Sequence, residues 1–327
     1  MTFNPTPGKI RGLAATSSAA GIFKVLALDH RDSMRVVIDP VDPQGISAQE
    51  LTDIKLGLLR RLEADATAVM LDPEYGAAQA IAARALPGNV GLLVAIEAQG
   101  YLGDPTARQT SLLDGWGVEK AKRLGANGIK LLVLYRPDAG SVTEAQDQMI
   151  EAVAVDCARY DIPLFLEPLA YAIEPGLSPD SAEFAVKRRG IVVDTVRRLG
   201  ALGPDVLKVQ FPVDTRFEDD RSVWVEACAE LNEAAPVPWV LLSGGDPYEL
   251  FREQLRVACD AGASGFIVGR ALWGEYIRAT ADEQPRLMDE VVQPRFTELA
   301  ALADEHGHDW GEHHVFPGAD ERWYLGY

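Results

Sequence analysis

Short apolar runs alternate along this chain with longer stretches in which apolar residues recur at helical spacing. The runs are rich in β-branched residues and apolar on both faces, which is typical of strands in a parallel sheet. The eight runs are Lys24–Asp29, Thr67–Asp72, Val90–Glu97, Gly128–Tyr135, Pro163–Pro168, Val206–Pro212, Trp239–Gly244 and Gly265–Arg270. The main helical stretches between them are Ala48–Glu63, Val118–Leu124, Thr143–Tyr160, Phe184–Leu199, Ser222–Ala234 and Pro247–Ala261. This repeat predicts a single-domain (β/α)8 TIM barrel of the α/β class. A doubly wound open sheet is the alternative, and it would need no eighth strand.

The chain extends beyond this repeat at both ends. Residues 1–22 are rich in Gly, Ala, Ser and Thr and are expected to form an arm or a short helix, followed by the barrel over residues 23–281. Helical patterns near Leu272–Ala281 and Leu287–His306 predict a helical extension and tail over residues 282–327. This part of the chain holds His306, His308, His313 and His314. Metal binding is one interpretation, but a solvated tail, or one packed against a neighbouring subunit, is favoured.

Composition narrows the class of protein. The 327 residues suffice for one barrel of roughly 250 residues with extensions. A formal net charge of −18 with no basic stripe argues against nucleic acid as a partner. The first residues show no signal-peptide pattern, and no apolar run reaches the ~20 residues of a membrane span. Cys157, Cys228 and Cys259 have no paired spacing and are expected to be reduced. We therefore expect a cytoplasmic enzyme that forms a homo-oligomer and does not contact membranes.

The run Val206–Pro212 holds the residue on which the functional interpretation depends. Gly203-Pro204 precede it and Pro212 closes it, so Lys208 is expected within a buried strand. A buried lysine is costly unless its charge is paired, and burial favours the neutral amine. A neutral amine is a nucleophile that can form a Schiff base with a carbonyl. The alternative is a lysine that reaches solvent at the strand end or joins a structural ion pair.

Charged residues on several predicted strands are expected to meet. In a barrel, residues of one parity face inward, and the active site lies at the C-terminal ends of the strands. The inward candidates are Lys208, Gln210 and Pro212 on one strand and Lys130, Glu167 and Asp29 on three others. Any one of the charged residues could belong to a structural ion pair. Four that converge from four strands are hard to explain as core packing, because unpaired buried charge is expensive.

These side chains have complementary chemistry. A second ammonium, that of Lys130, would favour the neutral form of Lys208. Glu167 could move protons between carbinolamine, Schiff base and enamine. Asp29 could act on the substrate hydroxyl whose proton is lost as a carbon–carbon bond breaks. His30 and Arg31 follow Asp29 and, like Gln210, are candidate substrate-binding residues.

The last two predicted strands carry a candidate phosphate site. Ser243, Gly244 and Gly245 follow the seventh strand and open a helix, and Gly269 and Arg270 end the eighth. Loops after strands 7 and 8 commonly bind phosphate in this fold, through backbone N–H groups, a helix N-terminus and a cation. Glycines let the backbone approach an anion closely. A tight turn beside a surface arginine is the alternative.

Histidine placement bears on the mechanism. A metal-dependent aldolase needs several imidazole ligands around its ion. Of the five histidines only His30 lies at a predicted strand end. A zinc enolate mechanism would therefore lack ligands, so we expect neither a metal nor an organic cofactor.

Several blocks of this sequence resemble the tagatose 1,6-bisphosphate aldolase family. These blocks are Leu26–Arg31 (LALDHR), Leu71–Gly76 (LDPEYG), Lys130–Leu134 (KLLVL), Asp161–Glu167 (DIPLFLE), Asp205–Val209 (DVLKV), Pro238–Ser243 (PWVLLS), Ala261–Phe266 (AGASGF) and Gly269–Trp273 (GRALW). They span roughly residues 20–275. The C-terminal blocks and Lys130–Leu134 are also similar to a sulfoglycolytic relative, 6-deoxy-6-sulfofructose-1-phosphate aldolase.

The resemblance implies a class I aldolase on a (β/α)8 barrel. Its Schiff-base lysine would be Lys208, with Asp29, Lys130 and Glu167 in the catalytic set. Ser243, the glycines after it and Arg270 would hold the phosphate of a dihydroxyacetone phosphate moiety. Three positions depart from the family pattern: His30 replaces an expected Gln, Gln210 an expected Glu, and Gly244 an Ala or Ser. His30 and Gln210 lie next to expected catalytic positions. They could therefore change which substrate stereochemistry is accepted, or how the part of the substrate away from the lysine is bound.

The expected activity is cleavage of a phosphorylated ketohexose, such as tagatose 1,6-bisphosphate, to dihydroxyacetone phosphate and glyceraldehyde 3-phosphate. The first alternative keeps this mechanism but releases sulfolactaldehyde from 6-deoxy-6-sulfofructose 1-phosphate. Two others are a non-catalytic sensor that binds sugar phosphates and a barrel lyase or isomerase of another kind. The configuration at C4 and the choice between phosphate and sulfonate at C6 stay open.

Overall fold

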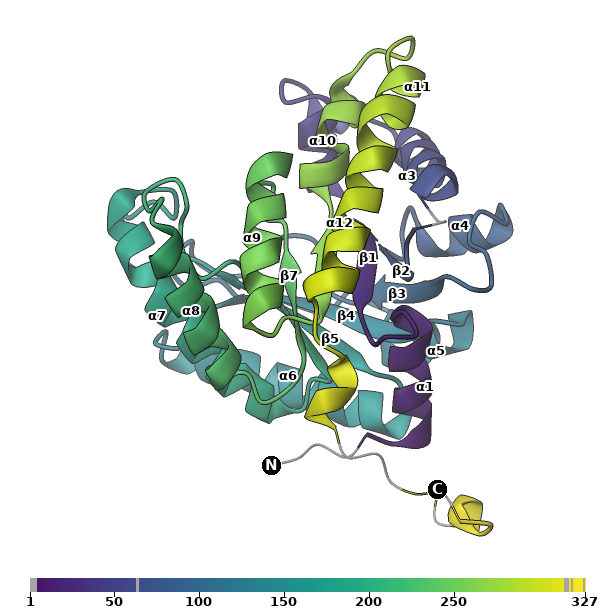
Figure 1. The fold of residues 1–327 in the computed structure, drawn as a ribbon, viewed down its shortest axis with the longest axis vertical. Helices are drawn as coiled ribbons and strands as arrows, with labels where there is room; N and C mark the ends of the chain where they lie inside the picture. The colour runs from purple at the N-terminus through teal and green to yellow at the C-terminus, as the bar shows by residue number, and fades with distance from the viewer. Residues whose placement is uncertain (1–4, 63–64, 315–317, 319, 326) are drawn as a thin grey trace.

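Eight parallel strands close into a barrel in the computed structural model, which describes residues 5–62, 65–314, 318, 320–325 and 327 (Figure 1). The strands are β1 (Phe23–Leu28), β2 (Ala68–Leu71), β3 (Gly91–Ala95), β4 (Gly128–Tyr135), β5 (Leu164–Ala170), β6 (Val206–Val209), β7 (Trp239–Leu242) and β8 (Gly265–Val268). Each predicted run overlaps one of them; β1 begins one residue before its run, β5 extends two residues beyond its run, and most of the others end before their runs do. The barrel prediction is confirmed, and the open-sheet alternative is wrong because β8 pairs with β1.

Helices alternate with the strands around the barrel (Figure 1). They are α1 (Pro7–Thr16), α2 (Asp32–Ile38), α3 (Ala48–Leu62), α4 (Ala77–Ala82), α5 (Val118–Leu124), α6 (Ser141–Arg159), α7 (Ala182–Leu199), α8 (Arg221–Ala234), α9 (Tyr248–Ala261), α10 (Arg270–Arg278), α11 (Gln284–Leu287) and α12 (Gln293–His306). The short helices α2 and α4 had no sequence prediction. Glu63, the last residue of one predicted helix, lies outside the described residues, as do the first four residues of the predicted arm.

The helix predicted over Leu287–His306 is interrupted. A π-helical turn at Met288–Val292 separates α11 from α12. Pro294 lies in the first turn of α12, and a proline there has no N–H for the backbone hydrogen bond to the preceding turn. The wider turn accommodates this missing donor.

Closure of the barrel requires a glycine at the start of β8. Gly265 has φ +119°, and a Cβ at this position would lie 2.1 Å from the carbonyl oxygen of Phe23. Phe23 is the residue with which Gly265 pairs across the β1–β8 seam. Only glycine allows both this backbone conformation and this approach.

Apolar side chains fill the barrel at the start of its strands. Phe23, Phe165 and Val206, from three strand starts, belong to one buried cluster with Leu13 of α1 and Trp310 near the C-terminus. Phe23 and Phe165 pack edge to face with ring centroids 5.5 Å apart. This apolar layer closes the barrel interior near the N-terminal ends of the strands.

The C-terminal histidines have separate environments. Nδ1 of His306 lies 2.8 Å from Asp260, and His308 lies 3.5 Å from Glu312. His314 is buried against Trp310. Within the described residues no group of three or more His, Cys, Asp or Glu side chains is arranged to hold a metal ion.

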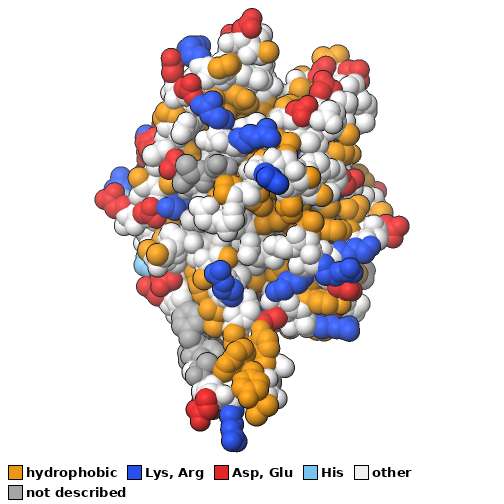
Figure 2. All heavy atoms as spheres, turned by 90° about the vertical axis from the view of Figure 1, so that its right-hand side faces the viewer, with side chains coloured by type: hydrophobic (Ala, Val, Ile, Leu, Met, Phe, Trp, Pro, Cys, Tyr) orange, Lys and Arg blue, Asp and Glu red, His pale blue; other side chains and the backbone are white. Residues whose placement is uncertain are grey.

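The end of the chain exposes apolar side chains. Trp323, Tyr324, Leu325 and Tyr327 are exposed, and Figure 2 shows hydrophobic side chains gathered on a lower tip of the molecule. Elsewhere on this face acidic and basic side chains are interspersed. No helix in the described part of the chain is long and apolar enough to cross a membrane.

Candidate active site

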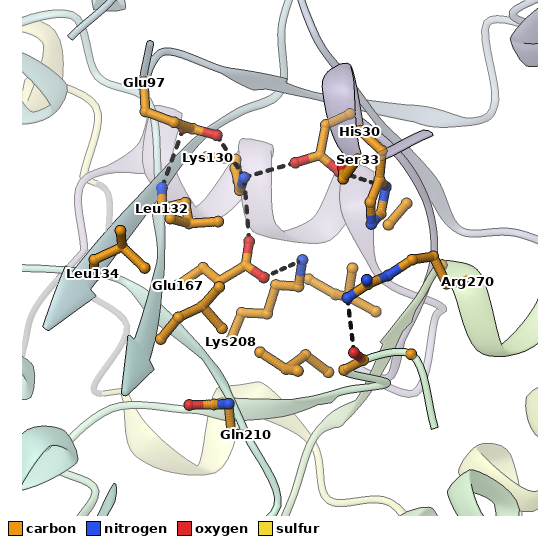
Figure 3. Close-up of a pocket in the computed structure, with 18 of the residues that line it drawn as sticks. His30, Ser33, Glu97, Lys130, Leu132, Leu134, Glu167, Lys208, Gln210 and Arg270 are labelled. Carbon is orange, nitrogen blue, oxygen red and sulfur yellow. Dashed lines mark hydrogen bonds and ion pairs between the residues drawn. The ribbon is translucent and has the colours of Figure 1, made fainter. Parts of the chain in front are cut away.

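Lys208 lies inside the barrel at the C-terminal end of β6. Its residue is 5% exposed, and its Nζ lies 2.8 Å from Oε1 of Glu167 on β5 (Figure 3). The same nitrogen lies 3.8 Å from the sulfur of Met70 on β2. The side chain therefore crosses the barrel interior, as the alternation of inward and outward positions predicts.

Lys130 on β4 is the electrostatic centre of the site. Its Nζ lies 2.6 Å from Asp29, 2.6 Å from Glu97 and 3.2 Å from Glu167. Burial disfavours the charged ammonium, but these three carboxylates outweigh burial and raise the pKa of Lys130 well above its ordinary value. Lys130 is therefore a fixed positive charge.

The same contacts keep two of the carboxylates ionised. Burial alone would raise the pKa of Asp29, yet Lys130 and Lys208 together hold it well below its usual range. Burial likewise opposes ionisation of Glu167, and the two lysines lower its pKa. Asp29 and Glu167 are therefore ionised beside Lys130 and Lys208.

Glu167 lies between the two lysines. One carboxylate oxygen contacts Lys208 and the other contacts Lys130 (Figure 3). Glu167 therefore screens the expected repulsion between the two ammonium groups.

Glu97 belongs to the site but was not among the predicted residues. It follows β3, accepts a hydrogen bond from the backbone N–H of Leu132 at 3.1 Å, and is 5% exposed. The signal was available, because the third apolar run ends in Glu97 as the first ends in Asp29. An acidic residue that ends an apolar run is the shared pattern.

Arg31 is committed to partners within the protein. Its guanidinium donates to Glu74 at 2.8 Å and to the carbonyl oxygen of Glu97 at 2.9 Å. Burial would lower the pKa of Arg31, but the acidic neighbours Glu74 and Glu97 raise it. These contacts join the loop after β1 to the segments that follow β2 and β3.

His30 has a neutral imidazole in this site. Burial lowers the pKa of His30 to about 3, although the nearby Asp29 opposes the shift. Its Nδ1 is buried, lies 3.7 Å from Asp29, and has no hydrogen-bond partner among the described residues. Its ring packs edge to face on Trp273, with centroids 5.1 Å apart. A ring nitrogen without a partner beside Asp29 can hydrogen-bond a hydroxyl of a bound ligand.

Gln210 also lines the cavity, near the end of β6 (Figure 3). Its side-chain carbonyl accepts a hydrogen bond from the backbone N–H of Ala170 at 2.8 Å. This bond fixes the side chain against the end of β5.

The predicted phosphate residues lie together at the ends of β7 and β8. Gly244 and Gly245 have φ of +58° and +99°, which glycine tolerates best. The hydroxyl of Ser243 accepts a hydrogen bond from the N–H of Gly269 at 3.3 Å, joining the two loops. Arg270, which begins α10 instead of ending β8, donates to the carbonyl oxygen of Gly244 at 2.7 Å.

Arg270 has no carboxylate partner among the described residues, since its guanidinium contacts only the backbone of the β7 loop within hydrogen-bonding distance. A side chain at Gly245 would meet the guanidinium, because its Cβ would lie 3.1 Å from Cζ of Arg270. The two loops and the start of α10 thus form a concave, positively charged surface that suits an anion.

A cavity of about 460 Å³ joins these groups. Asp29 lines it, and so do Lys130, Glu167, Lys208 and Arg270, whose side chains lie near one another in Figure 3. The volume suits a phosphorylated sugar. The arrangement brings an amine, adjacent carboxylates and an arginine together in one cavity.

Comparisons with known proteins agree with this geometry. Residues 23–275 match the DeoC/LacD family aldolase domain. The chain is 30% identical to tagatose 1,6-diphosphate aldolase 2 of Streptococcus agalactiae, over 94% of this chain and 98% of the relative. It is 32% identical to tagatose 1,6-diphosphate aldolase of Lactococcus lactis, over 82% of this chain and 85% of the relative.

Solved structures share the fold. A protein of Corynebacterium glutamicum, Cgl0159, superimposes with a TM-score of 0.64 and 16% identity over 89% of this chain and 88% of that one. An archaeal fructose 1,6-bisphosphate aldolase superimposes with a TM-score of 0.59 and 19% identity, over 89% and 97% of the two chains. These neighbours confirm the TIM barrel as the fold.

Proposed function

Since this chain belongs to the DeoC/LacD family of aldolases, we propose that it is a class I, Schiff-base aldolase with Lys208 as its nucleophile. Its substrate is a phosphorylated ketohexose, with tagatose 1,6-bisphosphate or a similar ketose 1,6-bisphosphate as the first candidate. The products are dihydroxyacetone phosphate and glyceraldehyde 3-phosphate. The observation that carries the proposal is the amine of Lys208, buried in the barrel 2.8 Å from the carboxylate of Glu167.

The first steps form the Schiff base. Glu167 takes a proton from Lys208, and the neutral amine attacks C2 of the substrate to give a carbinolamine. Glu167 then protonates the carbinolamine hydroxyl, which leaves as water. The resulting protonated imine is an electron sink adjacent to C3.

Cleavage of the C3–C4 bond follows. Asp29 accepts the proton of the C4 hydroxyl, since its lowered pKa keeps it in the ionised form that can accept one. The electron pair of the C3–C4 bond moves into the imine to form an enamine, and the C4 oxygen becomes the aldehyde of the leaving fragment. Protonation at C3 and hydrolysis release dihydroxyacetone phosphate and regenerate Lys208.

Lys130 and the anion-binding surface at the ends of β7 and β8 prepare this chemistry without forming covalent bonds to the substrate. Lys130 stays charged and holds Asp29 and Glu167 at fixed positions. The surface formed by Ser243, Gly244, Gly245, Gly269 and Arg270 binds the C1 phosphate. Holding that phosphate places the C2 carbonyl over the lysine and lowers the entropic cost of the attack.

Several features stay predictions within this proposal. The same steps at Lys208 serve a substrate with sulfonate at C6, which would release sulfolactaldehyde instead. No metal or organic cofactor has a step in this scheme, and a homo-oligomer in the cytoplasm is its expected setting. A non-catalytic sensor would have no need for four converging charged groups.

The test is turnover of purified protein on the 1-phosphates and 1,6-bisphosphates of tagatose and fructose and on 6-deoxy-6-sulfofructose 1-phosphate, with and without EDTA. We expect equimolar dihydroxyacetone phosphate and aldehyde from at least one ketose, at a rate that EDTA leaves unchanged. Binding without cleavage would favour the sensor. Loss of activity with EDTA and its recovery with zinc would contradict the Schiff-base scheme.

A further inference from the structure

The segment between β3 and α5 forms an ordered wall of the cavity. Its residues 96–113 fold back on themselves as a hairpin, in which Leu102 and Gln109 exchange backbone hydrogen bonds of 2.8 and 2.9 Å. The N–H of Leu113 donates to the carbonyl oxygen of Ile96 at 2.9 Å. The hydroxyl of Thr110 accepts from the N–H of Leu134 at 3.0 Å, which fixes the hairpin to β4.

Arg108 projects from this hairpin into the lining of the cavity. Its guanidinium carbon lies 4.8 Å from the ring centroid of Tyr101 and 5.5 Å from that of Tyr171. Its Nε donates to the carbonyl oxygen of Pro105 at 2.9 Å. The two rings and this bond hold the guanidinium plane in place. The two terminal nitrogens of the Arg108 guanidinium make no hydrogen bond or ion pair with any described residue.

The absence of a carboxylate partner separates Arg108 from most cations of the cavity. Lys208 and Lys130 contact Glu167, and Arg31 contacts Glu74. Among the described lysines and arginines that line the cavity, only Arg108 and Arg270 have no carboxylate within ion-pair distance. The chain has 49 acidic and 31 basic residues, so an arginine without an acidic partner is free to meet a charge from outside the protein.

The two unpaired arginines lie on different sides of the barrel mouth. Arg108 follows β3 and its guanidinium lies over Tyr171, which follows β5, whereas Arg270 follows β8 and contacts Gly244, which follows β7. In the closed order of eight strands, these two groups lie on different arcs of the ring, with β6 between β5 and β7. Lys208, on β6, therefore lies between them. A ligand that spans the mouth would meet an arginine at each end and the reactive amine along its length.

We propose that Arg108 forms a second anion subsite, which binds a tetrahedral oxyanion, phosphate or sulfonate, on C6 of the substrate. This inference rests on the proposed function and identifies what holds the far end of the ketose. Arginine suits the role because its planar fork donates two parallel hydrogen bonds to such a group. The Arg270 surface then fixes C1, and the hairpin selects substrates that carry an anion at C6.

The test compares Arg108→Gln with wild type on ketohexose 1-phosphate, ketohexose 1,6-bisphosphate and 6-deoxy-6-sulfoketohexose 1-phosphate. We expect kcat/KM to fall by about 10- to 100-fold for a substrate with a C6 anion, and to change little for the 1-phosphate. The substrate that loses most identifies the natural group as phosphate or sulfonate. Arg108→Lys should recover part of the loss by restoring the charge without the fork.

Arg159→Gln is the matched control, because Arg159 also packs over a tyrosine ring, that of Tyr160, but lies on the exposed face of α6. It should leave all three values unchanged. An equal effect of Arg108→Gln on all three substrates, or none, would overturn the second subsite and leave the Schiff-base proposal intact. Failure of wild type to cleave any of the three would overturn both.

Discussion

The two ends of β6 each hold a buried lysine–carboxylate contact, and the two contacts differ in kind. At the start of the strand, Asp205 is bound by Lys9 of α1, with Nζ–oxygen distances of 3.1 and 2.8 Å. At its other end, Lys208 contacts Glu167, which also contacts Lys130. Only the second contact faces the cavity that holds the candidate active site.

The comparison shows that burial of a lysine does not by itself indicate a reactive amine. The Lys9–Asp205 pair ties α1 to the base of the barrel, and Asp205 also accepts the backbone N–H of Leu164 at 2.8 Å. Burial raises the pKa of Asp205, and Lys9 offsets part of that shift. The pair therefore stabilises the fold. Lys208 differs because its carboxylate is shared with a second cation and its nitrogen faces a space that a substrate can enter.

Matched lysine-to-methionine substitutions at the two ends test this difference. We expect Lys208→Met to lower kcat by at least about 10⁴-fold, because no other group can form the Schiff base. In Lys208→Met, Glu167 keeps Lys130 as a partner. The free energy of unfolding of this variant should therefore fall less than that of Lys9→Met. Steady-state kinetics and urea denaturation measure both effects. Residual activity within tenfold of wild type would contradict the role of Lys208.

Lys9→Met should show the opposite pattern. It leaves the fully buried Asp205 without the Lys9 ammonium, and breaking a buried pair in this way costs about 3–5 kcal/mol of stability. The folded fraction should keep the wild-type kcat, because Lys9 lies at the floor of the barrel. Urea denaturation followed by kinetics at low temperature checks both. A loss of kcat with unchanged stability would remove the distinction between the two ends.

Arg270→Ala probes the anion site at the active end. We expect KM to rise by about 10- to 100-fold, since a charge-assisted contact to an anion contributes about 1.5–3 kcal/mol. Because Lys208 is untouched, kcat should change less than KM. Inhibition by inorganic phosphate should weaken in parallel. An unchanged KM would count against the C1-phosphate assignment.

His30→Gln gives the smallest effect, and it appears in the pH dependence of stability. The folded protein keeps His30 neutral down to a pKa of about 3, whereas the unfolded chain binds this proton below about 6.5. The unfolded state therefore holds more protons in this window, and stability falls as the pH drops from about 6.5 to about 3. At pH 5 the His30→Gln variant should therefore take up about one proton fewer on unfolding than the wild type does. The slope of unfolding free energy against pH measures this, and identical slopes would show that His30 is charged when folded.

The pattern of the sequence predicted most of the barrel, because strands buried on both faces leave an unmistakable apolar run. It also brought Asp29, Lys130, Glu167 and Lys208 together, since inward parity and strand ends are properties of the chain itself. The short helices α2 and α4 were missed, whereas α5, which also has seven residues, was predicted; a left-handed glycine, Gly125, ends α5, and neither α2 nor α4 has one at its end.

Other features depended on tertiary contacts. Lys9 lay in a segment expected to be an arm, and only the docking of α1 brings it to Asp205. Arg108 lay in a loop between predicted elements, and only the backbone pairing of residues 96–113 turns it toward the cavity. Glu97 could have been found, because it ends its apolar run as Asp29 does.

The most direct test of the account is to reduce the protein with borohydride in the presence of isotopically labelled dihydroxyacetone phosphate and to map the adduct by peptide mass spectrometry. The account predicts one labelled site, Lys208, and no label on the neighbouring Lys130, whose charge is held by three carboxylates. A label on Lys130, or no stable adduct at all, would contradict it.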